Sequence, residues 1–150
     1  MNEKTTKQIE EMMNQTIGVE VEMNSITRTK AAELAAEFFG TGRHEHTAGR
    51  NGYDTYSAWD GEGREWKFQK DVSIAGPDSE KCEMVTPILT YKDIETLRSL
   101  SADFGKRVQR AMRQGAAEYT FTLAQKVTHR RLCETSQTLW QAMKACLQAP

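Results

Sequence analysis

The stretch Thr16–Met23 reads TIGVEVEM and alternates strictly between apolar and polar side chains. Its apolar side chains fall on one side, while Glu20 and Glu22 fall on the other. Alternation of this kind predicts a half-buried β-strand, because successive side chains leave opposite faces of a strand. The two carboxylates are then about 6.5–7 Å apart along the backbone, so both can reach one hard cation. An edge strand with a solvated acidic face is the alternative interpretation.

Length and composition limit the classes of protein that fit this strand. A chain of 150 residues is long enough for one domain with a sizeable core. Lysines and arginines total 20 against 21 aspartates and glutamates, so no overall positive charge indicates a nucleic-acid partner. No apolar run approaches the roughly 20 residues that cross a bilayer, and no signal-peptide pattern follows the first residue. We therefore expect a cytoplasmic protein that does not enter a membrane.

Cysteines and histidines give little sign of a metal site. The three cysteines have no metal-binding spacing, so neither a disulfide framework nor a zinc site is expected, and Cys82 is interpreted as a small buried residue. His44 and His46 lie in the polar segment 41–52, for which the composition predicts a loop. Two histidines at this spacing can hold a metal on a strand, but in such a loop they are more often solvated.

The residues on either side of the strand predict helices. Residues 3–15 predict either a short, weak helix or a frayed lead-in. After the strand, Thr27 is a suitable N-cap and Gly40 a suitable C-terminal stop for an amphipathic helix. Further along, Thr90 and Asp93 form a capping box that predicts the start of a long helix. The apolar positions of that helix are Ile94, Leu97, Leu100, Phe104 and Val108.

The middle of the chain predicts three more strands. Residues 53–59 and 65–71 read as a hairpin whose turn, 60–63, contains two glycines that allow positive φ. Residues 81–87 predict another short strand. The order β-α-β-β-β-α with hairpin links predicts an α+β fold, a mostly antiparallel sheet with helices on one face. The opposite face is then open for a polar site.

Six polar side chains are predicted to share this open face. They are Glu20, Glu22, Lys67, Gln69, Asp71 and Glu83. Two carboxylates about 4 Å apart repel each other by about 4 kcal/mol at an effective dielectric constant of about 20. A folded protein therefore tolerates such a cluster only if cations or water compensate the charges. Mg2+ accepts carboxylate oxygens, and Lys67 or Lys70 can neutralise a transferring phosphoryl group. Because no glycine-rich phosphate loop occurs, these residues fit Mg-ATP chemistry without a P-loop.

Three ordered motifs within about residues 16–100 resemble the amidoligase family. They are 18–23 (GVEVEM), 66–74 (WKFQKDVSI) and 82–89 (CEMVTPIL). This bacterial family resembles glutamine synthetase and glutamate–cysteine ligase. The resemblance implies a partial glutamine synthetase-like catalytic domain that uses ATP and Mg2+ to join carboxylate and amine substrates, small molecules or peptides, through an acyl phosphate.

The resemblance also implies roles for individual residues. The metal ligands that it implies are Glu20, Glu22 and Glu83. It also implies that Lys70 and Asp71 help to place the nucleotide or substrate and that Arg28 is a substrate contact. Lys67 joins Lys70 as a predicted nucleotide-binding residue because of its charge, as argued above. Clamping and charge neutralisation by the metal are part of the implied mechanism.

The C-terminal third departs from the family. Family members continue after the long helix with a strand of the form Val-His-Ile-His-Ile-Gly, but residues 118–125 read EYTFTLAQ. One permitted spelling of these codons, GAG TAC ACA TTC ACA TTG GCG CA, gives Val-His-Ile-His-Ile-Gly-Ala when read two bases further on. We therefore hypothesise a frameshift between about residues 101 and 115. The alternative is a divergent C-terminus with a strand at 119–123 and a helix at 134–147.

The sequence thus divides into a lead-in at 1–15, an amidoligase-like region at 16–105 and a helical tail of doubtful frame at 106–150. The predicted function is that of an ATP-dependent amidoligase, as a truncated or inactive member that retains magnesium or nucleotide binding at best. A non-catalytic interaction module that uses its C-terminal helices is the alternative. The C-terminal third is a basic tail that carries Lys106, Arg107, Arg110, Arg113, Lys126, Arg130, Arg131 and Lys144. Nucleic-acid binding through this tail is disfavoured, because no set of aromatic stacking residues accompanies the charges.

Overall fold

The computed structural model describes residues 3–47, 54–113 and 124–129. The strands are β1 (Thr16–Met23), β2 (His44–His46), β3 (Tyr56–Trp59), β4 (Glu65–Gln69), β5 (Cys82–Val85), β6 (Leu89–Thr90) and β7 (Ala124–His129). The helices are α1 (Glu3–Met13), α2 (Arg28–Phe38) and α3 (Ile94–Arg113), with short 3-10 turns η2 (Asp78–Glu80) and η3 (Tyr91–Asp93).

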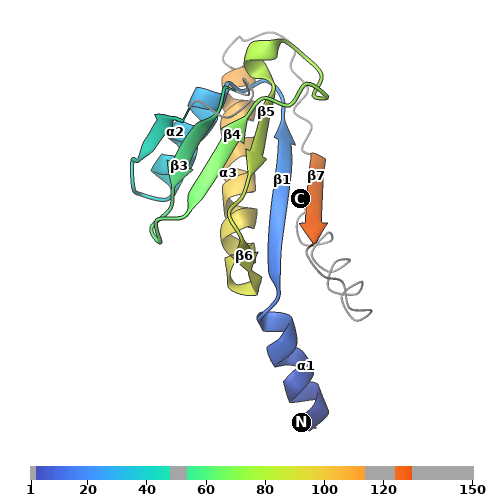
Figure 1. Ribbon diagram of the computed structural model, residues 1–150. Coiled ribbons are helices and arrows are strands. Elements are labelled where there is room, and N and C mark those ends of the chain that lie inside the picture. Colours follow the sequence, from blue (N-terminus) through green and yellow to red (C-terminus); the bar gives the residue numbers. More distant parts are fainter. Residues whose placement is uncertain (1–2, 48–53, 114–123, 130–150) are drawn as a thin grey trace.

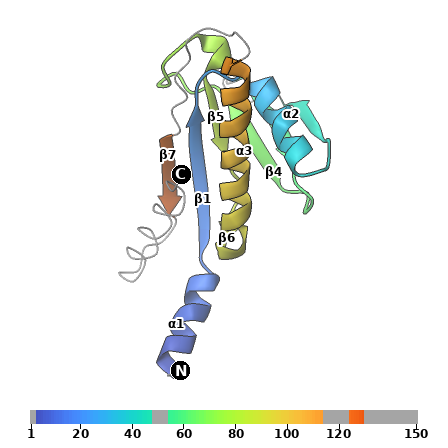
Figure 2. The same cartoon turned by 180° about the vertical axis from the view of Figure 1, so that it is seen from behind.

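The described residues form a seven-stranded sheet in which neighbouring strands are antiparallel. The strand order is β2-β3-β4-β5-β1-β6, and β7 pairs with the other edge of β1. Helices α2 and α3 lie on the same face of this sheet, while α1 extends away from the start of β1 (Figures 1 and 2). The predicted α+β fold, with helices on one face of a mostly antiparallel sheet, is confirmed. In the part of the chain that the structure describes, no helix is apolar and long enough to cross a membrane.

β1 supplies the centre of the core, as its alternation predicts. Its apolar residues Ile17, Val19, Val21 and Met23 are all at most 6% exposed, whereas the positions between them are partly exposed or exposed. Trp66 and Phe68 of β4 and Cys82 and Met84 of β5 are fully buried on the same, helix-covered side. Burial of this much aromatic and aliphatic surface is the main source of the fold's stability.

The two packed helices fit the sheet in different ways. α2 presents four fully buried alanines, Ala31, Ala32, Ala35 and Ala36. Such small side chains allow a helix backbone to come close to the strands. α3 instead presents large side chains, and its buried Phe104 lies edge-on to Phe68 with 6.1 Å between the ring centroids.

The predicted helix ends are also confirmed. The Thr27 side chain accepts a hydrogen bond from the Lys30 backbone N–H at 3.2 Å, and Gly40 has a φ of +70° just beyond α2. Thr90 and Asp93 form the capping box, in which the Asp93 carboxylate accepts from the Thr90 backbone N–H at 2.8 Å. The capped segment begins as the 3-10 turn η3, which leads directly into α3.

The hairpin between β3 and β4 is tied to α3 by a buried carboxylate. Asp60 accepts hydrogen bonds from the Trp66 indole N–H at 3.0 Å and from Arg64 Nε at 2.8 Å. Arg64 also pairs with Asp93 at 2.9 Å, next to the start of α3. Burial acts to raise the pKa of Asp60, but the hydrogen bonds from Trp66 and Arg64 outweigh it, so the pKa lies below its ordinary value.

Residues 44–46 correct one sequence prediction. They form the edge strand β2 and not part of a loop, because their backbone pairs with β3 in the register His44↔Ala58 and His46↔Tyr56. A strand of this kind is held by backbone hydrogen bonds, and all its side chains are exposed, so its composition resembles that of a loop. The other middle strands are shorter than the predicted ranges 53–59, 65–71 and 81–87.

The C-terminal third contains a strand inside the range 106–150, for which a helical tail is expected. β7 pairs with β1 along six positions, from Ile17↔His129 to Glu22↔Ala124. The predicted strand at 119–123 and the predicted helix at 134–147 lie outside the described residues. The side chain of Val108 is likewise outside what the structure describes.

Candidate functional site

The face of the sheet that no described helix covers brings the predicted acidic residues together. Glu22 on β1 lies directly opposite Glu83 on β5, and Glu83 lies opposite Gln69 on β4. Glu20 occupies the next position on the same side of β1, opposite Val85. Opposed residues on antiparallel strands have Cβ atoms about 4.5–5.5 Å apart. The three carboxylates implied as metal ligands therefore share one small area.

Glu83 lies at the centre of this area and is 9% exposed. Burial raises the pKa of Glu83, the hydrogen bond that Gln69 Nε2 donates at 2.9 Å opposes the rise, and the charges of Glu20, Asp71 and Glu22 add to it. The pKa of Glu83 therefore lies above its ordinary value. We call Glu20, Glu22, Asp71 and Glu83 the acidic cluster, because the negative charges of the first three act on the Glu83 carboxyl group.

Asp71 and Lys70 are neighbours in the chain but have different surroundings. Asp71 follows β4 and accepts a hydrogen bond from the Ser73 backbone N–H at 2.8 Å, which turns the chain. Lys70 forms an ion pair with Asp78, which is also 3.2 Å from Lys81. The hydrogen bonds from Lys70 and Lys81 lower the pKa of Asp78. The structure thus places Asp71 in the acidic cluster and directs the charge of Lys70 to the loop before β5.

Arg28, the implied substrate contact, connects loops. Its side chain is 10% exposed. Nη2 lies 2.6 Å from the Asp54 carboxylate, while Nη1 donates to the carbonyls of Asp78 at 3.0 Å and Lys81 at 2.9 Å. Nε donates to the Asp54 carbonyl at 3.1 Å. All three nitrogens are engaged within the protein, so the structure gives Arg28 the role of joining α2 to the segments before β3 and β5.

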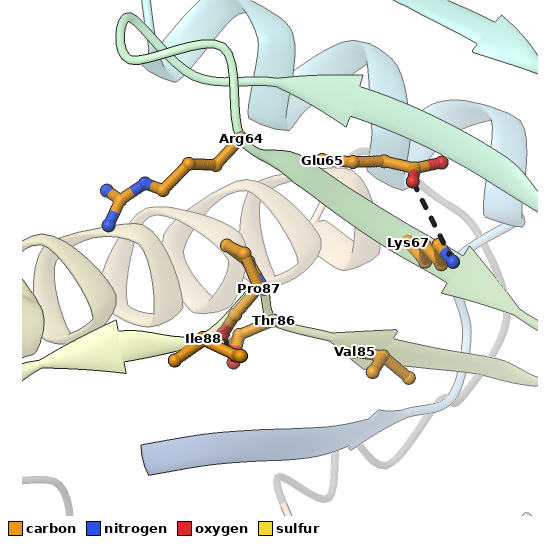
Figure 3. A pocket seen from close by; sticks show the side chains of 7 residues that line it. All are labelled: Arg64, Glu65, Lys67, Val85, Thr86, Pro87 and Ile88. Atoms are coloured by element: carbon orange, nitrogen blue, oxygen red, sulfur yellow. Dashed lines mark hydrogen bonds and ion pairs between the residues drawn. The ribbon is translucent and has the colours of Figure 1, made fainter. Parts of the chain in front are cut away.

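Lys67 lies on the open face beside the acidic cluster, opposite Val85. Its side chain is half exposed, and its ammonium lies 3.7 Å from the Glu65 carboxylate. Together they line an open hollow of about 540 Å3 between β4 and the segment 85–88 (Figure 3). The remaining lining residues are Arg64, Val85, Thr86, Pro87 and Ile88.

His44, His46 and Cys82 lie outside this site. His44 and His46 are exposed as expected, and His46 Nε2 is 3.0 Å from the Asp54 carboxylate. Cys82 is fully buried, and burial raises the pKa of its thiol. Its interpretation as a small buried residue is confirmed.

The acidic cluster fits Mg2+ in the chemical type of its donors, since hard cations prefer carboxylate and amide oxygens. In residues 3–47, 54–113 and 124–129, however, no three carboxylate, histidine or cysteine side chains already converge on one point as a metal site. Glu83 is hydrogen-bonded to Gln69 instead. Binding of an ion therefore requires the glutamates to change rotamer on a backbone that already places them side by side.

Sequence reasoning missed the junction that shapes the hollow. The Val19 backbone N–H donates to Thr86 Oγ1 at 3.0 Å, and the Thr86 N–H donates to the Val19 carbonyl at 3.0 Å. The signal was the Thr86-Pro87 pair, because proline lacks the N–H that continues a strand ladder. Asp78, which binds both Lys70 and Lys81, had no comparable signal.

The fold and this face define an α+β domain in which carboxylates gather on the side of the sheet that the described helices leave open. The family described as "putative amidoligase enzyme" matches residues 13–142. The protein therefore belongs to this amidoligase family. The match is wider than the residues 16–100 that carry the three motifs, and it continues past residues 101–115, where the frameshift is hypothesised. No curated protein and no solved structure matches the chain.

Proposed function

We propose that the acidic cluster holds Mg2+ for an ATP-dependent carboxylate–amine ligation, and that this chain by itself binds the ion or nucleotide without turning substrate over. The absence of a Val-His-Ile-His-Ile-Gly motif after residue 113 is the reason to expect binding without turnover. Membership of the amidoligase family supports the ligase reaction.

The observation that carries the proposal is the position of Glu83. It is a buried carboxylate whose pKa is raised by burial and by three neighbouring negative charges. Like charges directly opposed on a sheet destabilise it. A divalent cation at this place removes that repulsion and gains several oxygen ligands at once.

The proposed reaction has two balanced steps. A carboxylate oxygen of the substrate attacks the terminal phosphorus of ATP, the bond to ADP breaks, and an acyl phosphate forms. The amine nitrogen then attacks the acyl carbon, phosphate leaves with the bridging oxygen, and the nitrogen loses a proton. Bound Mg2+ supplies charge neutralisation on the phosphates.

The chain's own residues have separate parts in this scheme. Glu20, Glu22 and Glu83 hold the ion. Lys67 offers a positive charge on the same face. It lies opposite Val85, and its neighbour on that face of β4, Gln69, lies opposite Glu83. Lys70 reaches a phosphate only if it leaves Asp78.

Thermal unfolding with and without Mg2+ tests the proposal. We expect Mg2+ to raise the melting temperature of the wild type, because a ligand at about 100 times its Kd stabilises the folded state by about 2.7 kcal/mol. Glu20→Gln and Glu22→Gln should lose this response. Glu95→Gln should keep it, since Glu95 is an exposed carboxylate on α3 whose side chain is 75% exposed.

Two results would count against the metal site. The first is an equal response in all four proteins, and the second is a wild type that Mg2+ does not stabilise. The second result, together with a gain in stability from Glu22→Gln, favours the non-catalytic interaction module. ADP release from ATP with carboxylates and amines should stay at background, and sustained release would contradict the expectation of binding without turnover.

A further inference from the structure

The hollow beside the acidic cluster has a specific structural cause. β1 pairs with the segment after β5 at Val19↔Thr86 and again with β6 at Ile17↔Leu89. Between these pairings β1 has one residue and the opposite segment has two, Pro87 and Ile88. One extra residue on one strand is a β-bulge, which bends that strand and redirects its side chains.

The bulge leaves an apolar side chain in solvent at the edge of the hollow. Ile88 is 68% exposed, and Val85 and Pro87 line the hollow next to it. A single exposed isoleucine is ordinary on a protein surface. Here three apolar residues line one open hollow of about 540 Å3, a volume within the range of small-molecule sites.

The two cations that line the hollow differ in their availability to a ligand. Arg64 is 2.8 Å from Asp60 and 2.9 Å from Asp93, so its charge is compensated. Lys67 has a looser contact, 3.7 Å to Glu65. Figure 3 shows Arg64 and Lys67 pointing to opposite ends of the hollow. An anionic group of a ligand is therefore best received at the Lys67 end.

That end adjoins the acidic cluster. Val85 on β5 is paired with Lys67 on β4 and, on its other side, with Glu20 on β1. Neighbouring strands are about 4.8 Å apart, so a carboxylate at Lys67 lies within two strand spacings of Glu20. A ligand whose carboxylate binds Lys67 can then rest its body on Val85, Pro87 and Ile88.

We infer that this hollow binds the carboxylate substrate and selects one with an apolar body. The assignment of the ligand as a substrate rests on the proposed function, whereas its binding in the hollow does not. Lys67 receives the carboxylate, in place of the nucleotide contact predicted for it from the sequence, and the bulge residues Pro87 and Ile88 contact the apolar group. The preferred substrate class is therefore an aliphatic or aromatic amino-acid derivative or peptide end with a free carboxylate.

The test uses three probes on the full chain without Mg2+ or ATP. N-acetylleucine has both features, N-acetylleucinamide lacks the carboxylate, and N-acetylglycine lacks the apolar side chain. NMR titration follows the methyl signals of Ile88 and of Val85, which also lines the hollow and reports binding in the Ile88 variant as well. We expect N-acetylleucine to shift these signals and to bind at least about fivefold more tightly than either of the other probes, in line with what a buried apolar group or a charge contact contributes.

Variants locate the binding. Ile88→Asn and Lys67→Gln should each weaken N-acetylleucine binding about fivefold or more. Val72→Asn is the matched control, because Val72 is also apolar and 75% exposed but does not line the hollow. It should bind as the wild type does. All three positions are exposed, so the variants should fold, and their melting temperatures verify this.

Three outcomes would overturn the inference. They are equal binding of the three probes, absence of shifts at Ile88, and equal weakening by Val72→Asn. The Glu20→Gln and Glu22→Gln variants separate this inference from the proposed function. They should lose the response to Mg2+ and still bind N-acetylleucine, so either proposal can fail while the other holds.

Discussion

Glu22 and Glu83 face each other directly across β1 and β5, on the side of the sheet that no described helix covers. Two like charges in this position lower the stability of a sheet. Proteins tolerate such a cost at sites where function needs it. The Glu22–Glu83 pair therefore lowers the stability of the metal-free protein while it supports the proposed metal binding.

Glu83→Gln should stabilise the protein in the absence of divalent ions by about 0.5–1 kcal/mol at pH 7. The amide oxygen of the variant still accepts the hydrogen bond from Gln69. The substitution removes the negative charge of a buried carboxyl group whose pKa is raised. Because the folded-state pKa is the higher one, the wild type loses stability as pH rises through it. The gain from the variant should be largest above that pKa and vanish below the ordinary value of 4.5.

Urea unfolding across the pH range measures this difference. Glu95→Gln, on the exposed side of α3, should change stability by less than about 0.5 kcal/mol at every pH. A destabilised Glu83→Gln protein would show that the carboxylate is satisfied by contacts other than those described.

Asp60→Asn should destabilise the protein by about 2–3 kcal/mol, because the buried Trp66 N–H and Arg64 lose a charged acceptor. The pKa of Asp60 is lowered, so its contribution is complete above the ordinary value of 3.8 and is lost as pH falls through the folded-state pKa. The variant should therefore show a shallower loss of stability in acid. Tryptophan fluorescence during urea unfolding reports both effects.

Glu62→Gln is the matched control for this turn, since the Glu62 side chain is 73% exposed. Its stability should stay within about 0.5 kcal/mol of the wild type. Equal losses in the two variants would mean that the turn, and not the Asp60 carboxylate, is responsible.

Arg28→Lys should cost about 2–3 kcal/mol of stability, because an ammonium cannot reproduce the contacts with Asp54, Asp78 and Lys81. The response to Mg2+ should remain. Denaturant unfolding and the Mg2+ titration measure the two effects. Unchanged stability with loss of probe or nucleotide binding would instead support the substrate contact that the family resemblance implies.

The reading frame of the C-terminal third is settled by the coding DNA. The frameshift hypothesis predicts that the codons for residues 118–125 spell Val-His-Ile-His-Ile-Gly when read two bases further on. If the shifted frame contains stop codons, or spells residues other than this motif, the frameshift hypothesis is wrong and the divergent in-frame C-terminus holds. The family match continues in the present frame through residue 142, which favours the in-frame alternative, and the coding DNA decides between the two.

Much of the fold could be predicted from local patterns. The alternation in Thr16–Met23, the Thr27 cap and the Thr90–Asp93 capping box each depend on neighbours within a few residues, and the structure contains all three. The edge strand at His44–His46 could not be predicted in this way, because it depends on backbone pairing with Tyr56–Trp59 and not on its own side chains.

The candidate site divides in the same way. Local alternation was sufficient to predict which face of β1 and β5 carries carboxylates, because side-chain direction alternates along any strand. The position of Glu83 opposite Glu22, the pairing of Lys70 with Asp78 and the loop contacts of Arg28 could be found only in the folded protein. These relationships depend on strand register and loop path, which arise from contacts between residues distant in the chain.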